Sequence, residues 1–205
     1  MSDVTSAADA DANTQYRRVR PPDHLDESML AFLRTTKFYD QGRPLNAHQL
    51  LSHHPAAGRS LNRFLDWGDQ AVLSARERRL LILRTASLAR CEYELSVHRQ
   101  QGVRSGDVSP DEVAALEVES MPWPSSVTPR EVALLAIADA ICRTDTLDDE
   151  QWATAVGALT AADIIECLIV VGYYRMCSGI MNALAVPPEG DMSPTATAAP
   201  SDGAR

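Results

Sequence analysis

The sequence has no strong basic patch of the kind that binds nucleic acid or an anionic membrane. Its 205 residues carry a formal net charge of -9, and the longest basic cluster is "YRRVR" at residues 16–20. A surface that binds a polyanion requires positive charge that nearby carboxylates do not compensate. We therefore expect neither nucleic acid nor a membrane as a partner, and the expected ligand is a small molecule.

Closely spaced cysteine pairs are also missing. The four cysteines, Cys91, Cys142, Cys167 and Cys177, form no CxxC pair and show no spacing typical of zinc sites. No apolar segment of a secretory signal precedes them. We therefore expect reduced thiols, a cytoplasmic location, and a chain without a metal or another cofactor.

The sequence lacks an uninterrupted apolar run long enough to cross a membrane. Its longest apolar stretch, "IIECLIVVGYYRMCSGIMNALAV", is broken by Glu166, Arg175 and Asn182. Such interruptions are unfavourable in a lipid-facing span, and the pattern is typical of a buried helix.

No stretch alternates with period two for long enough to predict a strand, whereas helix start signals are frequent. Five segments fit a capping box or a weaker version of it: Ser74-x-x-Glu77, Ser109-x-x-Glu112, Thr128-x-x-Glu131, Asp148-x-x-Gln151 and Thr160-x-x-Asp163. The sequence therefore predicts an all-α domain of six to eight helices. Two long helices, 76–102 and 161–185, are expected to form its centre.

The length and composition predict one compact domain. A chain of 205 residues with 45% apolar content can bury one good core. The two ends are rich in small and polar residues and bury too little apolar area to offset their ordering entropy. We therefore expect disordered tails at 1–20 and 189–205, and one helical domain at 21–188.

The stretch "RCEYELSVHRQQG", residues 90–102, holds the candidate chemistry. On one continuous helix Arg84, Cys91 and His98 fall within about 40° of one another, and Glu94 lies about another 40° to one side. Glu94 and His98 are four residues apart and can touch. Spacing alone fits a surface ion pair equally well, with Cys91 as a small buried residue. A helix break between Arg84 and Glu94 would contradict an active site built on this stripe.

The segment "RERRLLILRTASLARCEYELSVHRQQGVRSG" resembles the signature helix of the carboxymuconolactone decarboxylase family. The matching positions are Ile82, Leu83, Arg84, Tyr93, Glu94, His98 and Gly106. The similarity extends over about residues 45–187. It implies an alkylhydroperoxidase D-like helical fold, homo-oligomers such as trimers or hexamers, and a family that includes decarboxylases and thiol peroxidase partners.

Several positions depart from the pattern of the family. The peroxidase branch has two cysteines three residues apart before the histidine, and here these positions hold Cys91 and Glu94. Without a resolving thiol no disulfide can cycle within this helix. Five positions before the arginine of the ILR segment, Arg84, the family often has an acidic residue, and this chain has Arg79. The decarboxylases often have tryptophan at the position that Leu95 occupies here.

The resemblance implies a cofactor-independent lyase that decarboxylates a small oxo-acid or lactone acid through an enolate. His98 would transfer the proton, Glu94 would orient the imidazole, and Arg84 would bind a substrate anion. The stripe is expected to face the long helix with Tyr173 and Tyr174, so these tyrosines and Cys91 are further candidates for substrate contact. An isomerase or cyclase of secondary metabolism, a thiol peroxidase-like protein and a non-catalytic binding subunit remain alternatives.

Overall fold

The computed structural model describes residues 16–36, 44–66, 70–118, 122–190 and 192, and within these ranges the chain is helical and contains no strand. The prediction of an all-α fold is confirmed, with nine helices in the described ranges rather than six to eight. They are α2 (Glu27–Leu33), α3 (Asn46–Leu51), α4 (Pro55–Arg63), α5 (Ala75–Leu88), α6 (Glu92–Ser105), α7 (Pro110–Leu116), α8 (Pro129–Thr144), α9 (Asp149–Ala158) and α10 (Ala161–Leu184).

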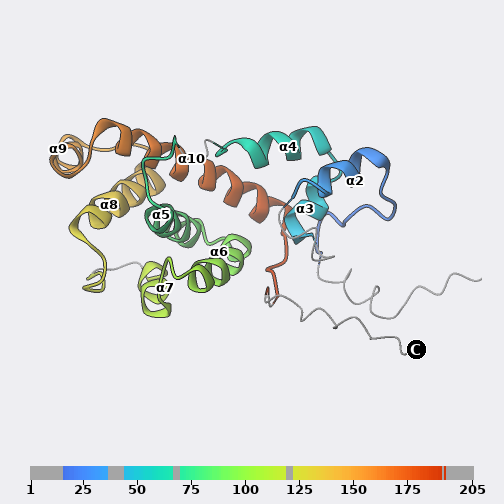
Figure 1. Cartoon of the computed structure of the whole chain (residues 1–205), viewed down its shortest axis with the longest axis horizontal. Helices are drawn as coiled ribbons and strands as arrows, with labels where there is room; N and C mark the ends of the chain where they lie inside the picture. Colours follow the sequence, from blue (N-terminus) through green and yellow to red (C-terminus); the bar gives the residue numbers. More distant parts are fainter. Residues whose placement is uncertain (1–15, 37–43, 67–69, 119–121, 191, 193–205) are drawn as a thin grey trace, which may run out of the picture.

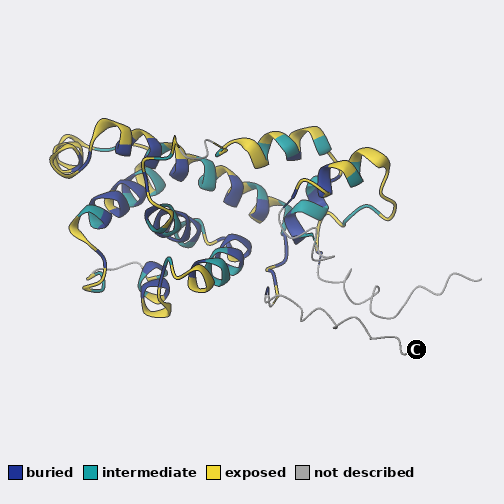
Figure 2. Ribbon diagram, viewed as in Figure 1, coloured by how far each residue is buried: buried dark blue, intermediate teal, exposed yellow. Residues whose placement is uncertain are grey.

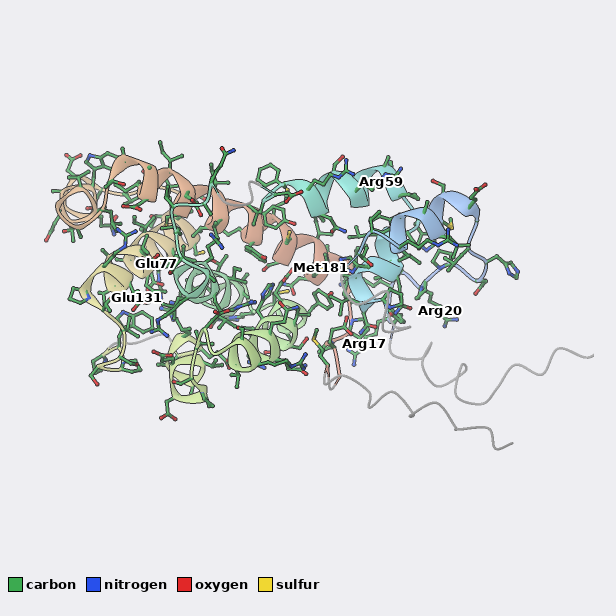
Figure 3. All side chains as sticks on the ribbon, viewed as in Figure 1. Arg17, Arg20, Arg59, Glu77, Glu131 and Met181 are labelled. Atoms are coloured by element: carbon green, nitrogen blue, oxygen red, sulfur yellow. The ribbon has the colours of Figure 1, made fainter. Side chains whose placement is uncertain are left out.

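The helices begin where the capping signals predicted. All five boxes form, each with the N-cap side chain bonded to the backbone of the third helical residue and the reciprocal bond in place. Two arginines then join these helix starts. Arg76 donates to Glu112 and Glu131, and Arg130 donates to Glu77 and Asp163. Glu77 and Glu131 therefore lie near each other where α5 and α8 begin (Figure 3).

The prediction of one continuous helix over 76–102 is wrong, because α5 ends at Leu88 and α6 begins at Glu92. Arg90 adopts a left-handed conformation with φ +50°. The Cys91 amide donates to the Ala86 carbonyl and the Arg90 amide donates to the Ser87 carbonyl, at 2.9 Å each. These bonds end α5 as a Schellman-type turn, and α6 starts in a new direction with Cys91 as its N-cap residue.

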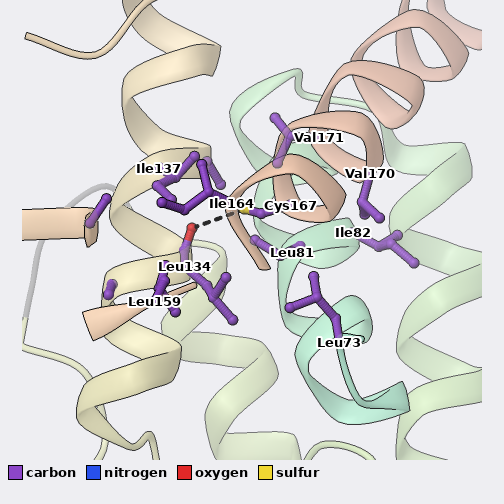
Figure 4. Close-up of a cluster of buried hydrophobic side chains, with 13 residues drawn as sticks. Leu73, Leu81, Ile82, Leu134, Ile137, Leu159, Ile164, Cys167, Val170 and Val171 are labelled. Atoms are coloured by element: carbon purple, nitrogen blue, oxygen red, sulfur yellow. Dashed lines mark hydrogen bonds between the residues drawn. The ribbon is translucent and has the colours of Figure 1, made fainter. Parts of the chain in front are cut away.

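The core is built around α5, which packs against α6, α8 and α10 and is seen end-on in the left half of Figure 1. Helices α2, α3 and α4 gather at the C-terminal end of α10, while α8 and α9 lie toward its other end (Figure 1). One apolar cluster joins α5, α8 and α10 and includes Leu81, Leu134, Ile137, Cys167 and Val170 (Figure 4).

The second long helix forms as predicted, over Ala161–Leu184. By length and composition alone α10 could cross a membrane, but 44% of its most apolar window is buried inside the fold. Its inner face is covered by α5 and α8, while much of its outer face is exposed (Figure 2). Burial in the core therefore accounts for the apolar residues of its inner face.

Residues just outside the predicted boundaries of 21 and 188 also contact the helices. The buried Tyr16 hydroxyl donates to the Asn46 side chain at 2.9 Å. Glu189 and Met192 are buried as well, and their amides donate to Ser96 and Gln100 of α6. The remainder of the predicted tails, 1–15 and 193–205, lies outside the described residues.

Candidate functional site

The first two turns of α6 bring Glu94 and His98 together, as their spacing predicted. His98 Nε2 lies 3.3 Å from Glu94 Oε2, and the two side chains are only 11% and 8% exposed. On the other side of the ring, Arg79 Nη1 of α5 lies 2.5 Å from His98 Nδ1. The imidazole is thus held between a carboxylate and a guanidinium.

This arrangement fixes the tautomer of His98. A guanidinium has only donors, so Arg79 must donate to the lone pair of Nδ1. The proton of the neutral imidazole then sits on Nε2, the ring nitrogen that lies 3.3 Å from Glu94 Oε2. The His98 and Tyr174 rings also form a T-shaped contact, with ring centroids 5.2 Å apart and planes at 85°. The side chain is therefore oriented from α5, α6 and α10 together.

A cavity of about 260 Å³ opens beside this pair. Helix α6 contributes Glu94 and His98 to its wall, and α10 contributes Tyr173, Tyr174 and Cys177. Residues from the other side of the cavity come from the end of α2, from α3 and from α4: Thr35, Thr36, His48, Leu51, Leu61 and Asn62. The predicted contact between the His98 face and the helix with Tyr173 and Tyr174 is confirmed.

A second cavity of about 370 Å³ adjoins the first, and both are lined by His98, Gln101 and Tyr174. Its walls carry the charged residues Asp66, Arg78, Arg79 and Asp107. His98 thus stands between a cavity with many uncharged and aromatic groups and one with charged groups. A small acid with an apolar or oxygenated body could occupy both.

Burial sets the protonation of several groups in the first cavity. It lowers the pKa of His48 to about 4, so this second imidazole is neutral near pH 7. Burial, aided by the charge of Glu94, raises the pKa of Cys177 to about 12. Burial and the same charge also raise the pKa of Tyr174. The cavity therefore offers neutral hydrogen-bonding groups around one carboxylate.

The structure does not bring Arg84 to this site. Its guanidinium is buried on another side of α5, where Nε and Nη2 donate to the Asp139 carboxylate at 2.6 and 2.9 Å. Nη1 donates to the Leu116 and Val118 carbonyls, and the Trp123 ring lies 5.1 Å away. Arg84 therefore ties α5 to α8 and to the end of α7. The stripe of Arg84, Cys91 and His98 does not exist, because the break at Arg90 separates its members. This break contradicts the active site that was built on the stripe, and only the Glu94–His98 pair within α6 is kept from it.

Cys91 is fully buried and packs in an apolar cluster with Tyr93, Val97 and Met181. It does not line either cavity. Tyr173 and Tyr174 do line the first cavity, and their rings contact each other at 5.1 Å. Tyr173 is also anchored, because its hydroxyl donates to the Leu61 carbonyl of α4 at 3.0 Å and its ring stacks on Phe64.

The polar residues of the cavities that sequence reasoning missed include His48, Asn62, Arg79 and Gln101. Gln101 could have been found, since it lies three positions after His98 and accepts from Arg79 at 3.3 Å. Arg79 had been noted only as a departure from the family pattern. His48 and Asn62 come from distant helices, and no local pattern relates them to α6. Within the described residues no cluster of three or more metal-ligating side chains is present.

Solved structures of peroxidase-related proteins share this helical fold. It resembles the alkylhydroperoxidase AhpD core of an uncharacterized peroxidase-related protein from Ralstonia eutropha JMP134, with a TM-score of 0.71, 17% identity, and coverage of 84% of this chain and 92% of that one. An uncharacterized peroxidase-related protein from Silicibacter sp. TM1040 gives a TM-score of 0.70 at 17% identity, over 84% and 92% of the two chains.

Residues 55–140, less than half of the chain, match the model of the carboxymuconolactone decarboxylase family, which is the family that the sequence resembles. A putative antioxidant defence protein AhpD from Agrobacterium tumefaciens, of unknown function, shares the fold with a TM-score of 0.60 and 18% identity, over 69% of this chain and 96% of the other. Among curated proteins, none matches the chain.

Proposed function

We propose that the protein is a cofactor-independent lyase that decarboxylates a small oxo-acid or lactone acid through an enolate. One observation carries this proposal: the Glu94–His98 pair forms the wall of a cavity instead of facing bulk solvent. A silent helical subunit has no need of a buried carboxylate–imidazole pair, which costs desolvation free energy.

In this reaction the loss of carbon dioxide leaves a carbanion that is delocalised as an enolate, and a proton must return to carbon. His98 transfers this proton, and Glu94 holds the imidazole and balances the charge of its protonated form. The phenol of Tyr174 lines the cavity and stays protonated because its pKa is raised, so it is suited to donate to the enolate oxygen. The same groups suit an isomerase or cyclase that forms an enolate.

The thiol peroxidase alternative receives less support from the residues. Peroxidase chemistry requires a thiolate, and burial raises the pKa of both Cys91 and Cys177. Although the solved neighbours are described as peroxidase-related, they share only the fold with this chain. The four free thiols are in keeping with the cytoplasmic location that we also propose.

The test is to incubate the purified protein with a panel of oxo-acids and lactone acids and to follow carbon dioxide release. We expect catalysed release from at least one compound, above the spontaneous rate measured with protein-free buffer. Consumption of a substrate without carbon dioxide would instead identify the isomerase or cyclase reaction. Thiol-dependent consumption of a peroxide, with no reaction on any acid, would contradict the proposal.

A further inference from the structure

Arg79 contacts His98 and also lines the second cavity. Its Nη1 donates to both His98 Nδ1 and Gln101 Oε1. Its Nε is buried and lies 3.5 Å from Asp107 Oδ2, an ion contact without hydrogen-bond geometry. Among the described residues no group accepts a hydrogen bond from Nε or Nη2. The Nε–H and Nη2–H groups of Arg79 therefore have no acceptor among the described residues, whereas both Nη1 hydrogens are used.

The unused Nε–Nη2 edge of the guanidinium has the shape that a carboxylate requires. Nε–H and one Nη2–H are parallel donors, and their spacing matches the two oxygens of a carboxylate. A buried donor without an acceptor costs free energy, which an incoming acceptor recovers. The cavity beside Arg79 measures about 370 Å³, which is enough for a small organic acid.

The contact of Arg79 with His98 has a chemical consequence. The neutral imidazole has one lone pair, on Nδ1, and the guanidinium occupies it. In this state His98 cannot accept a proton at Nδ1, while its Nε2 carries the ring proton and lies 3.3 Å from Glu94 Oε2. The acid–base group is therefore blocked as long as Arg79 stays in place.

We propose that Arg79 binds a carboxylate of the substrate and that this binding draws the guanidinium away from His98 Nδ1. The inference rests on the proposed function and adds its substrate class: an acid with a carboxylate that is kept through the reaction, since an ion pair to the departing carboxylate would stabilise the ground state. Arg79 is thus both the anion-binding residue, in place of Arg84, and the residue that makes His98 available only when substrate is bound.

The groups around His98 are consistent with this exchange. Glu94 faces it from its own helix, Arg79 from α5 and Tyr174 from α10. Asp66 and Asp107 line the same cavity as Arg79. Asp107 is the only one of these two carboxylates with an ion contact to Arg79 in the described residues, and its long 3.5 Å contact can yield to a better-aligned acceptor.

The test uses the full-length protein labelled with ¹⁵N in histidine, titrated with levulinate, a stable oxo-acid, and with its uncharged methyl ester. The His98 signals are assigned from their loss in His98→Asn. We expect levulinate, but not the ester, to shift the His98 Nδ1 signal toward that of an unbonded pyridine-type nitrogen. In Arg79→Gln this signal should start near that position, and levulinate should bind at least about tenfold more weakly.

Arg104→Gln is the matched control, because it removes an exposed arginine of α6 that lines neither cavity. It should behave as wild type. Equal binding of acid and ester, an unshifted Nδ1 signal at saturation, or no response to levulinate up to its solubility would each overturn the inference. If Arg79→Gln fails to fold, the comparison of levulinate with its ester on the wild-type protein still tests the inference. Because no turnover is measured, a carboxylate-dependent shift without any carbon dioxide release would reject the proposed reaction and leave this inference standing.

Discussion

The residues Glu94 and His98 can be read either as an acid–base unit or as a structural ion pair, and the two readings differ greatly in energy. A positioned proton-transfer group contributes about 10²- to 10⁴-fold to a rate, whereas an exposed pair four residues apart contributes about 0.5 kcal/mol or less to folding. Their low exposure and the adjoining cavity favour the first reading.

We therefore expect His98→Asn and Glu94→Gln each to lower turnover at least about a hundredfold, with little change in melting temperature. The double variant should lose much less than the product of the two, because each substitution disables the same unit. The measurement is steady-state kinetics on a compound that the wild type converts.

Glu92→Gln is a suitable control for this experiment. Glu92 also lies in the first turn of α6, but its side chain is 66% exposed and contacts Arg99 at 3.7 Å, outside the cavities. Its replacement should leave turnover nearly unchanged. If all three variants stay within a few-fold of wild type, the acid–base assignment is wrong and the protein is better described as a binding subunit.

At this scale the sequence predicted the site in part. Glu94 and His98 could be predicted because their four-residue spacing is contained within one helix. Arg84 was assigned incorrectly, since its relation to His98 depended on a continuous helix across fourteen residues. His48 could not be predicted, because only tertiary packing brings α3 to α6.

Among the helices, the turn between α5 and α6 has the largest effect on the site. A left-handed residue that ends a helix is usually glycine, whereas here it is Arg90. Cys91, which starts α6, makes no side-chain capping bond. Neither of the two usual signals of a helix boundary is therefore present. By contrast, the five capping boxes are short local patterns, and all of them were predicted correctly.

The same turn provides a test of backbone strain. Glycine adopts φ +50° without the steric cost that other residues carry, about 1–2 kcal/mol. We expect Arg90→Gly to raise the free energy of unfolding by about 1 kcal/mol and the melting temperature by about 2–4 °C. Calorimetry or urea unfolding measures both.

Arg104→Gly serves as the comparison, because Arg104 lies within the last turn of α6. Glycine in a right-handed helix is unfavourable by about 1 kcal/mol, so this variant should melt lower. A lower melting temperature for Arg90→Gly as well would show that the arginine side chain stabilises the turn by more than its backbone strain costs.

Over the whole molecule, Arg76 and Arg130 link the starts of four helices, and this makes the fold sensitive to acid. The Arg76 guanidinium holds the pKa of Glu112 at about 2, below its ordinary value of 4.5. Hydrogen bonds from Arg130 likewise lower the pKa of Asp163. Because these values are lowered in the folded state, the stabilisation is complete above about pH 4.5 and is lost as the pH falls toward 2.

We expect Glu112→Gln to lower the free energy of unfolding by about 2 kcal/mol at pH 7, the typical contribution of a hydrogen bond between charged groups. The difference from wild type should shrink between pH 4.5 and pH 2, since the wild-type carboxylate is protonated there. Urea unfolding at a series of pH values measures this. Asp23→Asn removes an exposed loop carboxylate and should change little; a difference that persists unchanged at pH 2 would refute the linkage.

The contacts of Asn46 also limit how far the chain can be shortened from its C-terminal side. The Asn46 side chain donates to the Pro187 carbonyl, and the Asn46 backbone amide donates to Glu189, which follows 143 residues later. Helix α3, which supplies His48 and Leu51 to the first cavity, is thus held by the segment that follows α10. The apolar cluster of α5, α8 and α10 contains no buried residue beyond Val171. A chain cut after Leu184 would therefore keep this cluster but lose contacts that hold the α3 wall of the cavity in place.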